Sequence, residues 1–255
     1  MKKVVSNEMD MTEGPLLKKI IVYTIPIILT GVLQLLFNAA DLIVVGRFGS
    51  DTSVAAVGAT TAIINLITNL FIGLSIGAGV AVAHSLGAGK SEDVHKTVHT
   101  AIPIAFVSGI VLTIVGVCGS RLFLELMGTP DDVINLSATY MKIYFIGITA
   151  SMIYNFGSAI LRATGDTKSP LIYLTVAGII NVILNLFFVV LLNMDVAGVA
   201  TATTISQTIS ALLILRAMMK RNDDCKLILR KMRFYRRQIV RIIQIGIPAG
   251  IQGSL

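Results

Sequence analysis

The sequence predicts an all-α membrane protein, in which a lobe of six transmembrane helices is followed by the start of a seventh span. Of its 255 residues, 55% are hydrophobic and only 14% are charged, and the mean hydropathy of +0.83 lies above the range of soluble domains. A bilayer core about 30 Å thick requires about 20 apolar residues of helix. Six runs meet this requirement, at Ile20–Val45, Val54–Ala83, Val98–Cys118, Leu136–Leu161, Ser169–Leu192 and Val196–Leu215.

Turn-forming residues separate these runs in chain order, so each run is predicted to be one helix. Inside the runs the only formal charges are Asp41 and Lys142, because the other acidic and basic residues fall in the connections. Glycine and proline favour tight turns between helices. They are Gly46 and Gly49 after the first run, Gly87 and Gly89 after the second, Gly128 and Pro130 after the third, and Gly165 and Pro170 after the fourth.

Lysine and arginine are distributed unequally between the two sides of the membrane, and this bias sets orientation. The connections after the odd-numbered runs lie on the side of the membrane opposite the N-terminus, and that side holds only Arg47, Arg121 and Lys142. We therefore expect a multi-pass protein of the cell inner membrane with a cytoplasmic N-terminus. The cytoplasmic side then holds Lys2, Lys3, Lys18, Lys19, Lys90, Lys96, Arg162, Lys168 and the basic cluster 216–241.

The predicted organisation has four parts. Residues 1–19 form a cytoplasmic N-terminal segment, 20–215 the six-helix lobe, 216–238 a basic cytoplasmic connecting segment, and 239–255 the start of a second lobe. Basic and apolar residues alternate along 216–237, which suits an amphipathic helix lying on anionic lipid headgroups. The other interpretation is a basic loop that only enforces topology.

The last residues repeat the pattern of the first run. A shift of 222 residues places Ile25, Pro26 and Gly31 on Ile247, Pro248 and Gly253. Six spans are an even number, so a second copy would enter the membrane in the same orientation and give parallel repeats. Because about 15 apolar residues are too short to cross the bilayer, we expect the sequence to be part of a longer, two-lobed protein.

Asp41 is the strongest candidate functional residue, because a carboxylate within a membrane span is costly unless it is protonated, paired or hydrated. Gln34, Asn38 and Asp41 lie at i, i+4 and i+7, on one helical face. Other runs carry polar residues at similar spacing, and we expect them to line a cavity between helices. They are Asn65 and Asn69 in the second run, Tyr140, Tyr144 and Asn155 in the fourth, and Asn181 and Asn185 in the fifth.

This residue set suits two kinds of chemistry. Carboxylate, amide and hydroxyl oxygens can coordinate Na⁺, a hard cation, with Asp41 as the central ligand, and a buried carboxylate can also carry a proton. A structural alternative is that the amides and hydroxyls only hydrogen-bond between helices. Pro26 removes a backbone hydrogen bond inside the first run, which predicts either a hinge or a static bend.

Other functional classes have weak support. The net charge of +7 does not indicate nucleic-acid binding, because nearly half of the basic residues lie in 216–241. Gly89-Lys90-Ser91 does not indicate nucleotide binding, because it lacks the leading glycine and the preceding strand of a phosphate loop. Cys118 and Cys225 do not indicate a metal site, because they have no partners at metal-ligand spacing. A membrane-embedded enzyme would need an acid–base pair or a nucleophile at membrane depth, so we expect neither an enzyme nor a cofactor beyond a coupling ion.

Motifs in the connections occur in a family-specific order. They are Pro26 with Asp41-x4-Gly46-x2-Gly49, then Leu86-Gly87-Ala88-Gly89-Lys90, then Arg162-Ala-Thr-Gly-Asp-Thr-Lys-Ser-Pro170, and Gly198-Val-Ala-Thr-Ala-Thr203. In this order the sequence resembles the multidrug and toxic compound extrusion (MATE) transporters. The resemblance implies one half of a twelve-helix, two-lobed antiporter that exports organic cations or drugs in exchange for H⁺ or Na⁺ by alternating access, with the C-terminal lobe expected in the full-length chain.

The resemblance also assigns roles to site residues. It implies that Asp41 binds the coupling ion or proton and that Asn181 and Asn185 share this site. Some members have an aspartate at the position of Asn185, so Asp41 would carry more of the coupling here. The alternative within the same superfamily is a flippase for lipid-linked precursors, whose cavity would be cationic, whereas these runs contain almost no basic residue. Substrate identity, the choice of ion and the oligomeric state stay open.

Overall fold

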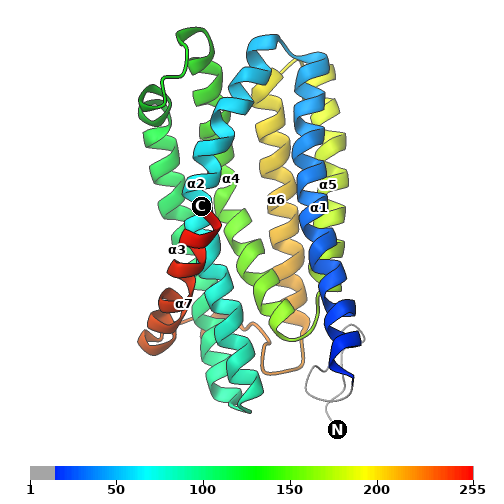
Figure 1. The fold of residues 1–255 in the computed structure, drawn as a ribbon, viewed down its shortest axis with the longest axis vertical. Coiled ribbons are helices and arrows are strands. Elements are labelled where there is room, and N and C mark those ends of the chain that lie inside the picture. The colour runs from blue at the N-terminus through cyan, green and yellow to red at the C-terminus, as the bar shows by residue number, and fades with distance from the viewer. Residues whose placement is uncertain (1–14, 255) are drawn as a thin grey trace.

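A computed structural model describes residues 15–254 as a bundle of long, roughly antiparallel helices (Figure 1). Six helices within these residues are long and apolar enough to cross a membrane, so the predicted fold class is confirmed. The elements are α1 (Leu16–Phe48), α2 (Asp51–Gly87), α3 (Ser91–Leu126), α4 (Asp131–Ala163), α5 (Lys168–Leu186), a π-helical turn η1 (Phe187–Leu191), α6 (Asp195–Lys220), a 3₁₀ turn η2 (Leu229–Lys231) and α7 (Arg236–Ser254).

Most spanning helices extend beyond the apolar runs that predicted them. The run predicted to start at Val98, for example, belongs to a helix that begins at Ser91 and has Glu92 and Asp93 in its first turn. An apolar run marks only the part of a helix that contacts lipid, whereas acidic residues stabilise a helix N-terminus through its dipole. The connections after α2 and α4 turn through Gly89 and Gly165, both with positive φ.

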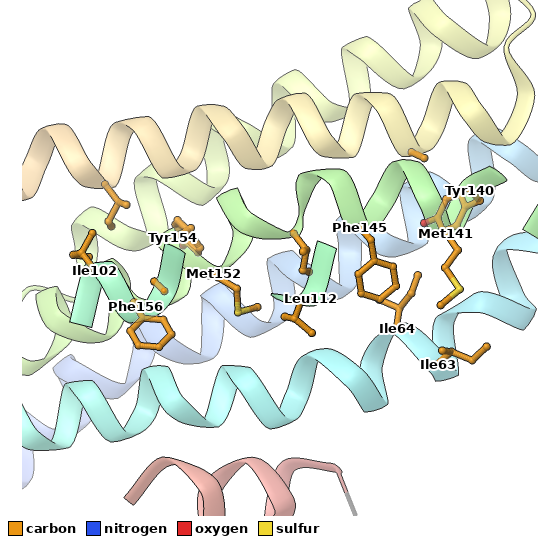
Figure 2. Close-up of a cluster of buried hydrophobic side chains, with 14 of the residues drawn as sticks. Ile63, Ile64, Ile102, Leu112, Tyr140, Met141, Phe145, Met152, Tyr154 and Phe156 are labelled. Carbon is orange, nitrogen blue, oxygen red and sulfur yellow. The ribbon is translucent and has the colours of Figure 1, made fainter. Parts of the chain in front are cut away.

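Helix α4 lies at the centre of the lobe. In the apolar stretch of α4, 56% of the residues are buried. In the apolar stretch of α1, which faces outward, only 11% are buried. Figure 2 shows Phe145, Met152 and Phe156 of α4 inside the cluster of buried side chains, which also contains Leu112 of α3. In lipid, helices associate mainly through close packing and interhelical hydrogen bonds. The Thr113 hydroxyl of α3 donates such a bond to the Phe145 carbonyl of α4 at 2.8 Å.

Helix α7 packs against α2 through glycines on both helices. Gly73 and Gly77 of α2 face Gly246 and Gly250 of α7, with backbone against backbone. Small residues spaced four apart permit this close approach in membranes. The side-chain amide of Asn69 also donates to the Gly253 carbonyl at 3.0 Å. The start of the sequence repeat is therefore held against the first lobe.

We expect Gly77→Leu to separate α2 from α7. A Cβ at Gly77 would lie 2.8 Å from the Gly246 nitrogen, a distance that requires one helix to move. Overpacking of this kind costs about 1–3 kcal/mol, so the thermal midpoint of the purified protein should fall. Gly58→Leu on the same helix is the matched control, because a Cβ there meets nothing within 4 Å. Equal midpoints for the two variants would contradict this packing argument.

The segment between α6 and α7, residues 221–235, is called the connector below. Of the two interpretations of 216–237, the amphipathic helix does not form: 216–220 belong to α6, and the connector is irregular apart from η2. Besides short turns of its own, it forms backbone hydrogen bonds to neighbouring helices. The Leu227 N–H donates to the Met218 carbonyl at 3.0 Å, and the Arg233 N–H donates to the His99 carbonyl at 3.2 Å.

His99 of α3 anchors the connector with its ring. Its Nδ1 lies 2.8 Å from the His95 carbonyl, and its Nε2 lies 3.0 Å from the Ile228 nitrogen. A carbonyl only accepts and a backbone N–H only donates, so Nδ1 carries the hydrogen and the imidazole is neutral. The residue is fully buried. His99 therefore has a structural role, in which it links α3 to the connector.

Replacing His99 by alanine should detach the connector from α3. The Ile228 N–H would lose its acceptor, at a cost of about 1–3 kcal/mol, so hydrogen exchange of the 226–232 peptide should accelerate by about tenfold or more. His95→Ala provides the control, since it removes only a ring stacked 4.0 Å from that of His99 and keeps the accepting carbonyl. Unchanged exchange in His99→Ala would show that other contacts hold the connector.

Candidate functional site

A polar cavity of about 430 Å³ lies between five helices of the lobe. Each helix contributes four lining residues, and among them there is one acid and no lysine, arginine or histidine. They are Gln34, Phe37, Asn38 and Asp41 of α1; Asn65, Thr68, Asn69 and Ile72 of α2; Tyr144, Ser151, Tyr154 and Asn155 of α4; Leu174, Ala177, Gly178 and Asn181 of α5; and Thr203, Ser206, Gln207 and Ser210 of α6.

Asp41 accepts hydrogen bonds from two other helices. The Asn185 amide of α5 donates to its Oδ1 at 2.5 Å, and the Thr203 hydroxyl of α6 donates to its Oδ2 at 3.2 Å. The residue lies about 10 Å from the end of α1, yet it is only 7% exposed. Both donors are neutral, and no ion pair of Asp41 occurs within residues 15–254. Its charge is therefore available to a cation or a proton.

The two asparagines of α5 continue this network. The Asn185 amide also donates to Asn181 Oδ1 at 3.2 Å, and the Asn181 amide donates to Thr203 Oγ1 at 3.2 Å. Asn185 Oδ1 is buried and has no hydrogen-bond donor within the described part of the chain. Such an oxygen normally has a partner. A carboxylate, amide oxygens and a hydroxyl form an all-oxygen donor set, which fits Na⁺.

Most of the residues predicted to form a cavity lie together in its wall. Asn185 lies behind the wall, fully buried, and reaches the cavity through its bond to Asp41. Tyr140 lies outside the cavity, contrary to expectation. It is one helical turn from Tyr144, with ring centroids 6.2 Å apart, and packs into the hydrophobic cluster (Figure 2). The residues in the wall are Gln34, Asn38, Asp41, Asn65, Asn69, Tyr144, Asn155 and Asn181.

Helix α6 contributes a polar face that the sequence analysis did not assign. Thr203, Ser206, Gln207 and Ser210 line the cavity, and their spacing of i, i+3, i+4 and i+7 places them on one side of the helix. The same spacing identified the face of α1 that bears Asp41. Applied to the sixth run, it would have found Thr203.

Pro26 lies inside α1 and is buried, but it is not beside Asp41. Fifteen residues separate them, or about 22 Å along a helix. The Thr30 hydroxyl donates to the Pro26 carbonyl at 2.7 Å, and the Tyr23 hydroxyl ties this end of α1 to the Arg162 carbonyl of α4 at 2.9 Å. A change of bend at Pro26 would therefore act on Asp41 only through the length of α1.

Comparison with known proteins gives the family of this lobe. The sequence profile of the MatE family matches residues 26–187, well over half of the chain, and this range includes Asp41, Asn181 and Asn185. The chain belongs to the MatE family. It is 29% identical over 243 residues to the probable multidrug resistance protein YpnP of Bacillus subtilis, a match that covers 95% of this chain and 54% of that protein.

Solved structures agree with this MatE assignment. One is an outward-facing multidrug resistance MATE transporter of the MOP superfamily, with a TM-score of 0.85, 26% identity, and coverage of 92% of this chain and 52% of that one. Another, with the same values, is a MOP superfamily transporter from Pyrococcus furiosus described as having a binding pocket of reverse polarity. The chain thus spans about half the length of the relatives it matches, and it is a multi-pass membrane protein.

Proposed function

We propose that this MatE chain forms one lobe of a secondary antiporter that exports organic cations or drugs in exchange for H⁺ or Na⁺ by alternating access. The observation that carries the proposal is the cavity with Asp41 as its one acid and no basic residue among its lining side chains. A polar, aromatic-containing cavity with one negative charge suits an amphipathic cation. The second lobe that the longer relatives contain would close the other side of the cavity.

In this mechanism Asp41 binds either the substrate cation or the coupling ion. The carboxylate attracts a cation while it is ionised, and a proton or Na⁺ that neutralises it removes that attraction. Asn185 and Thr203 each donate a hydrogen bond to one oxygen of the Asp41 carboxylate. The carboxylate therefore stays in the same position whether it binds the substrate cation or the coupling ion. Asn181 orients Thr203. The substrate cation and the coupling ion compete for this one carboxylate and cannot bind it at the same time. Such competition is the minimum requirement for exchange, because each ligand displaces the other.

We also propose that the N-terminus is cytoplasmic. Lys90, Lys96, Arg162 and Lys168 lie at the same end of the bundle as the connector, because the connections after α2, α4 and α6 are all at that end (Figure 1). The positive-inside rule places this end in the cytoplasm.

The flippase alternative is not favoured. A lipid-linked precursor carries phosphates, which require lysine or arginine in the cavity, and none lines this one. The reverse pocket polarity reported for the Pyrococcus furiosus relative shows that polarity varies within this superfamily. Cavity charge is therefore the property that should separate cation export from anion transport in this chain.

Transport by the full-length protein in proteoliposomes tests the proposal. We expect uptake of a fluorescent organic cation and no uptake of an anionic dye of similar size. An imposed pH gradient and an imposed Na⁺ gradient, applied separately, identify the coupling ion. Faster transport of the anion than of the cation would contradict the proposed substrate class, and transport that neither gradient accelerates would contradict antiport.

A further inference from the structure

A second cavity lies far from Asp41, between the beginning of α3 and the connector, and has a volume of about 660 Å³. We call it the connector cavity. Its charged lining consists of Lys96, Arg230, Lys231 and Arg233, against a single carboxylate, Glu92. Glu92 pairs with Lys96 at 2.6 Å, so three cations are left without an acid partner within the described residues. The charge of this cavity is opposite to that of the transport cavity.

The basic side chains stand on a backbone that is fixed in place. The Arg233 N–H donates to the His99 carbonyl, and the Arg233 carbonyl accepts from the Thr100 hydroxyl at 3.2 Å. The Lys96 ammonium lies 5.9 Å from the ring centroid of Tyr235, which holds it on the opposite wall. At the rim, Ser91 donates to the Asp224 carboxylate at 2.7 Å, which orients this acid toward the helix terminus. The backbone that carries these cations is therefore anchored to α3.

Apolar side chains alternate with these cations along the same segment. Leu229, Met232 and Phe234 are 52%, 40% and 54% exposed, and they lie where the membrane-spanning helices end. A free anion in water gains nothing from such side chains. The boundary between headgroups and acyl chains accommodates both, because apolar groups insert below the phosphates while basic groups bind them.

We propose that the connector cavity binds the phosphate headgroup of an anionic phospholipid from the leaflet at this end of the protein. Arg230 and Arg233 contact the phosphate, which arginine can bind through two parallel hydrogen bonds. Phe234 and Leu229 contact the first part of the acyl chains. Because the connector joins α6 to α7, the bound lipid holds the link between the six-helix lobe and the chain that follows. This site is independent of Asp41 and of the transported substrate.

Native mass spectrometry of the detergent-purified chain tests this site. With phosphatidylglycerol and phosphatidylcholine added at equal concentration, we expect one phosphatidylglycerol to bind preferentially. The double variant Arg230→Gln, Arg233→Gln should lower its affinity by about tenfold or more, because each basic residue near a lipid surface contributes substantially to anionic-lipid binding. Both side chains are exposed, so folding should be retained, as checked by the elution profile.

Matched variants separate a defined site from general surface charge. Lys18→Gln, Lys19→Gln removes the same charge from α1 at the same end of the bundle, outside the connector cavity, and should change the affinity by less than about twofold. Equal losses from both pairs, or no preference for phosphatidylglycerol, would overturn the proposal. Displacement of the lipid by millimolar inorganic phosphate would overturn it too, since the site would then be one for a soluble anion. Phe234→Ser should weaken lipid binding without creating such competition.

Discussion

Asp41→Asn is expected to abolish export of organic cations by the full-length protein. The side chain keeps its size and its position between Asn185 and Thr203, but the single negative charge of the cavity is lost. Two unit charges about 4 Å apart interact by about 4 kcal/mol in a partly polar environment. That corresponds to roughly a thousandfold in affinity for a cation. Efflux of a fluorescent organic cation from cells that express the variant should fall to background.

A matched control shows whether this loss comes from the site. Asp132→Asn removes an equal charge from the exposed first turn of α4, outside the cavity, and should leave efflux unchanged. Membrane levels of both variants must equal that of the parent. Undiminished efflux by Asp41→Asn at equal protein level would remove this carboxylate from the mechanism, and export would then have to depend on groups in the second lobe.

The fold was predictable because the bilayer imposes a simple physical constraint. A helix must present about 20 apolar residues to lipid, so runs with almost no charge, most of them separated by glycine and proline, located every spanning helix. The helix ends were less well predicted, as at Ser91, because polar helical turns beyond the bilayer have no apolar signal. The sequence left two interpretations of 216–237 open, because the conformation of the connector depends on bonds to α3. The bond from Ile228 to the ring of His99 joins residues 129 apart, and no local pattern reports it.

The candidate site was predictable in part. The free-energy cost of burying a carboxylate in a membrane span singled out Asp41, and helical spacing placed Asn181 and Asn185 on one face. Spacing says which residues share a face, but not how far along the helix the cavity extends, and Tyr140 was included for that reason. The bonds that Asp41 accepts from α5 and α6 join residues 144 and 162 apart in the sequence. They depend on how α1, α5 and α6 pack against one another, which composition does not determine.

Asn185→Leu is expected to weaken coupling without removing the charge. Asn185 is fully buried and donates to both Asp41 and Asn181. Leucine has a similar volume and no donor, so the Asp41 carboxylate would retain only Thr203 as a partner. Hydrogen bonds to charged groups contribute about 1.5–3 kcal/mol, which predicts a loss of about tenfold or more in cation transport. Initial rates at matched ion gradients in proteoliposomes measure it.

Asn185→Asp distinguishes a lost donor from a changed charge. Two carboxylates at the 2.5 Å separation of the present Asn185–Asp41 contact cannot both be ionised unless a proton or cation lies between them. The variant should therefore bind one more H⁺ or Na⁺ than the parent, and the dependence of its transport on pH or Na⁺ concentration should shift. Asn185→Leu has no second carboxylate and should show no such shift. If Asn185→Asp followed the pH and Na⁺ dependence of the parent protein, Asn185 would not contact the coupling ion, and its role would be confined to the packing of α5.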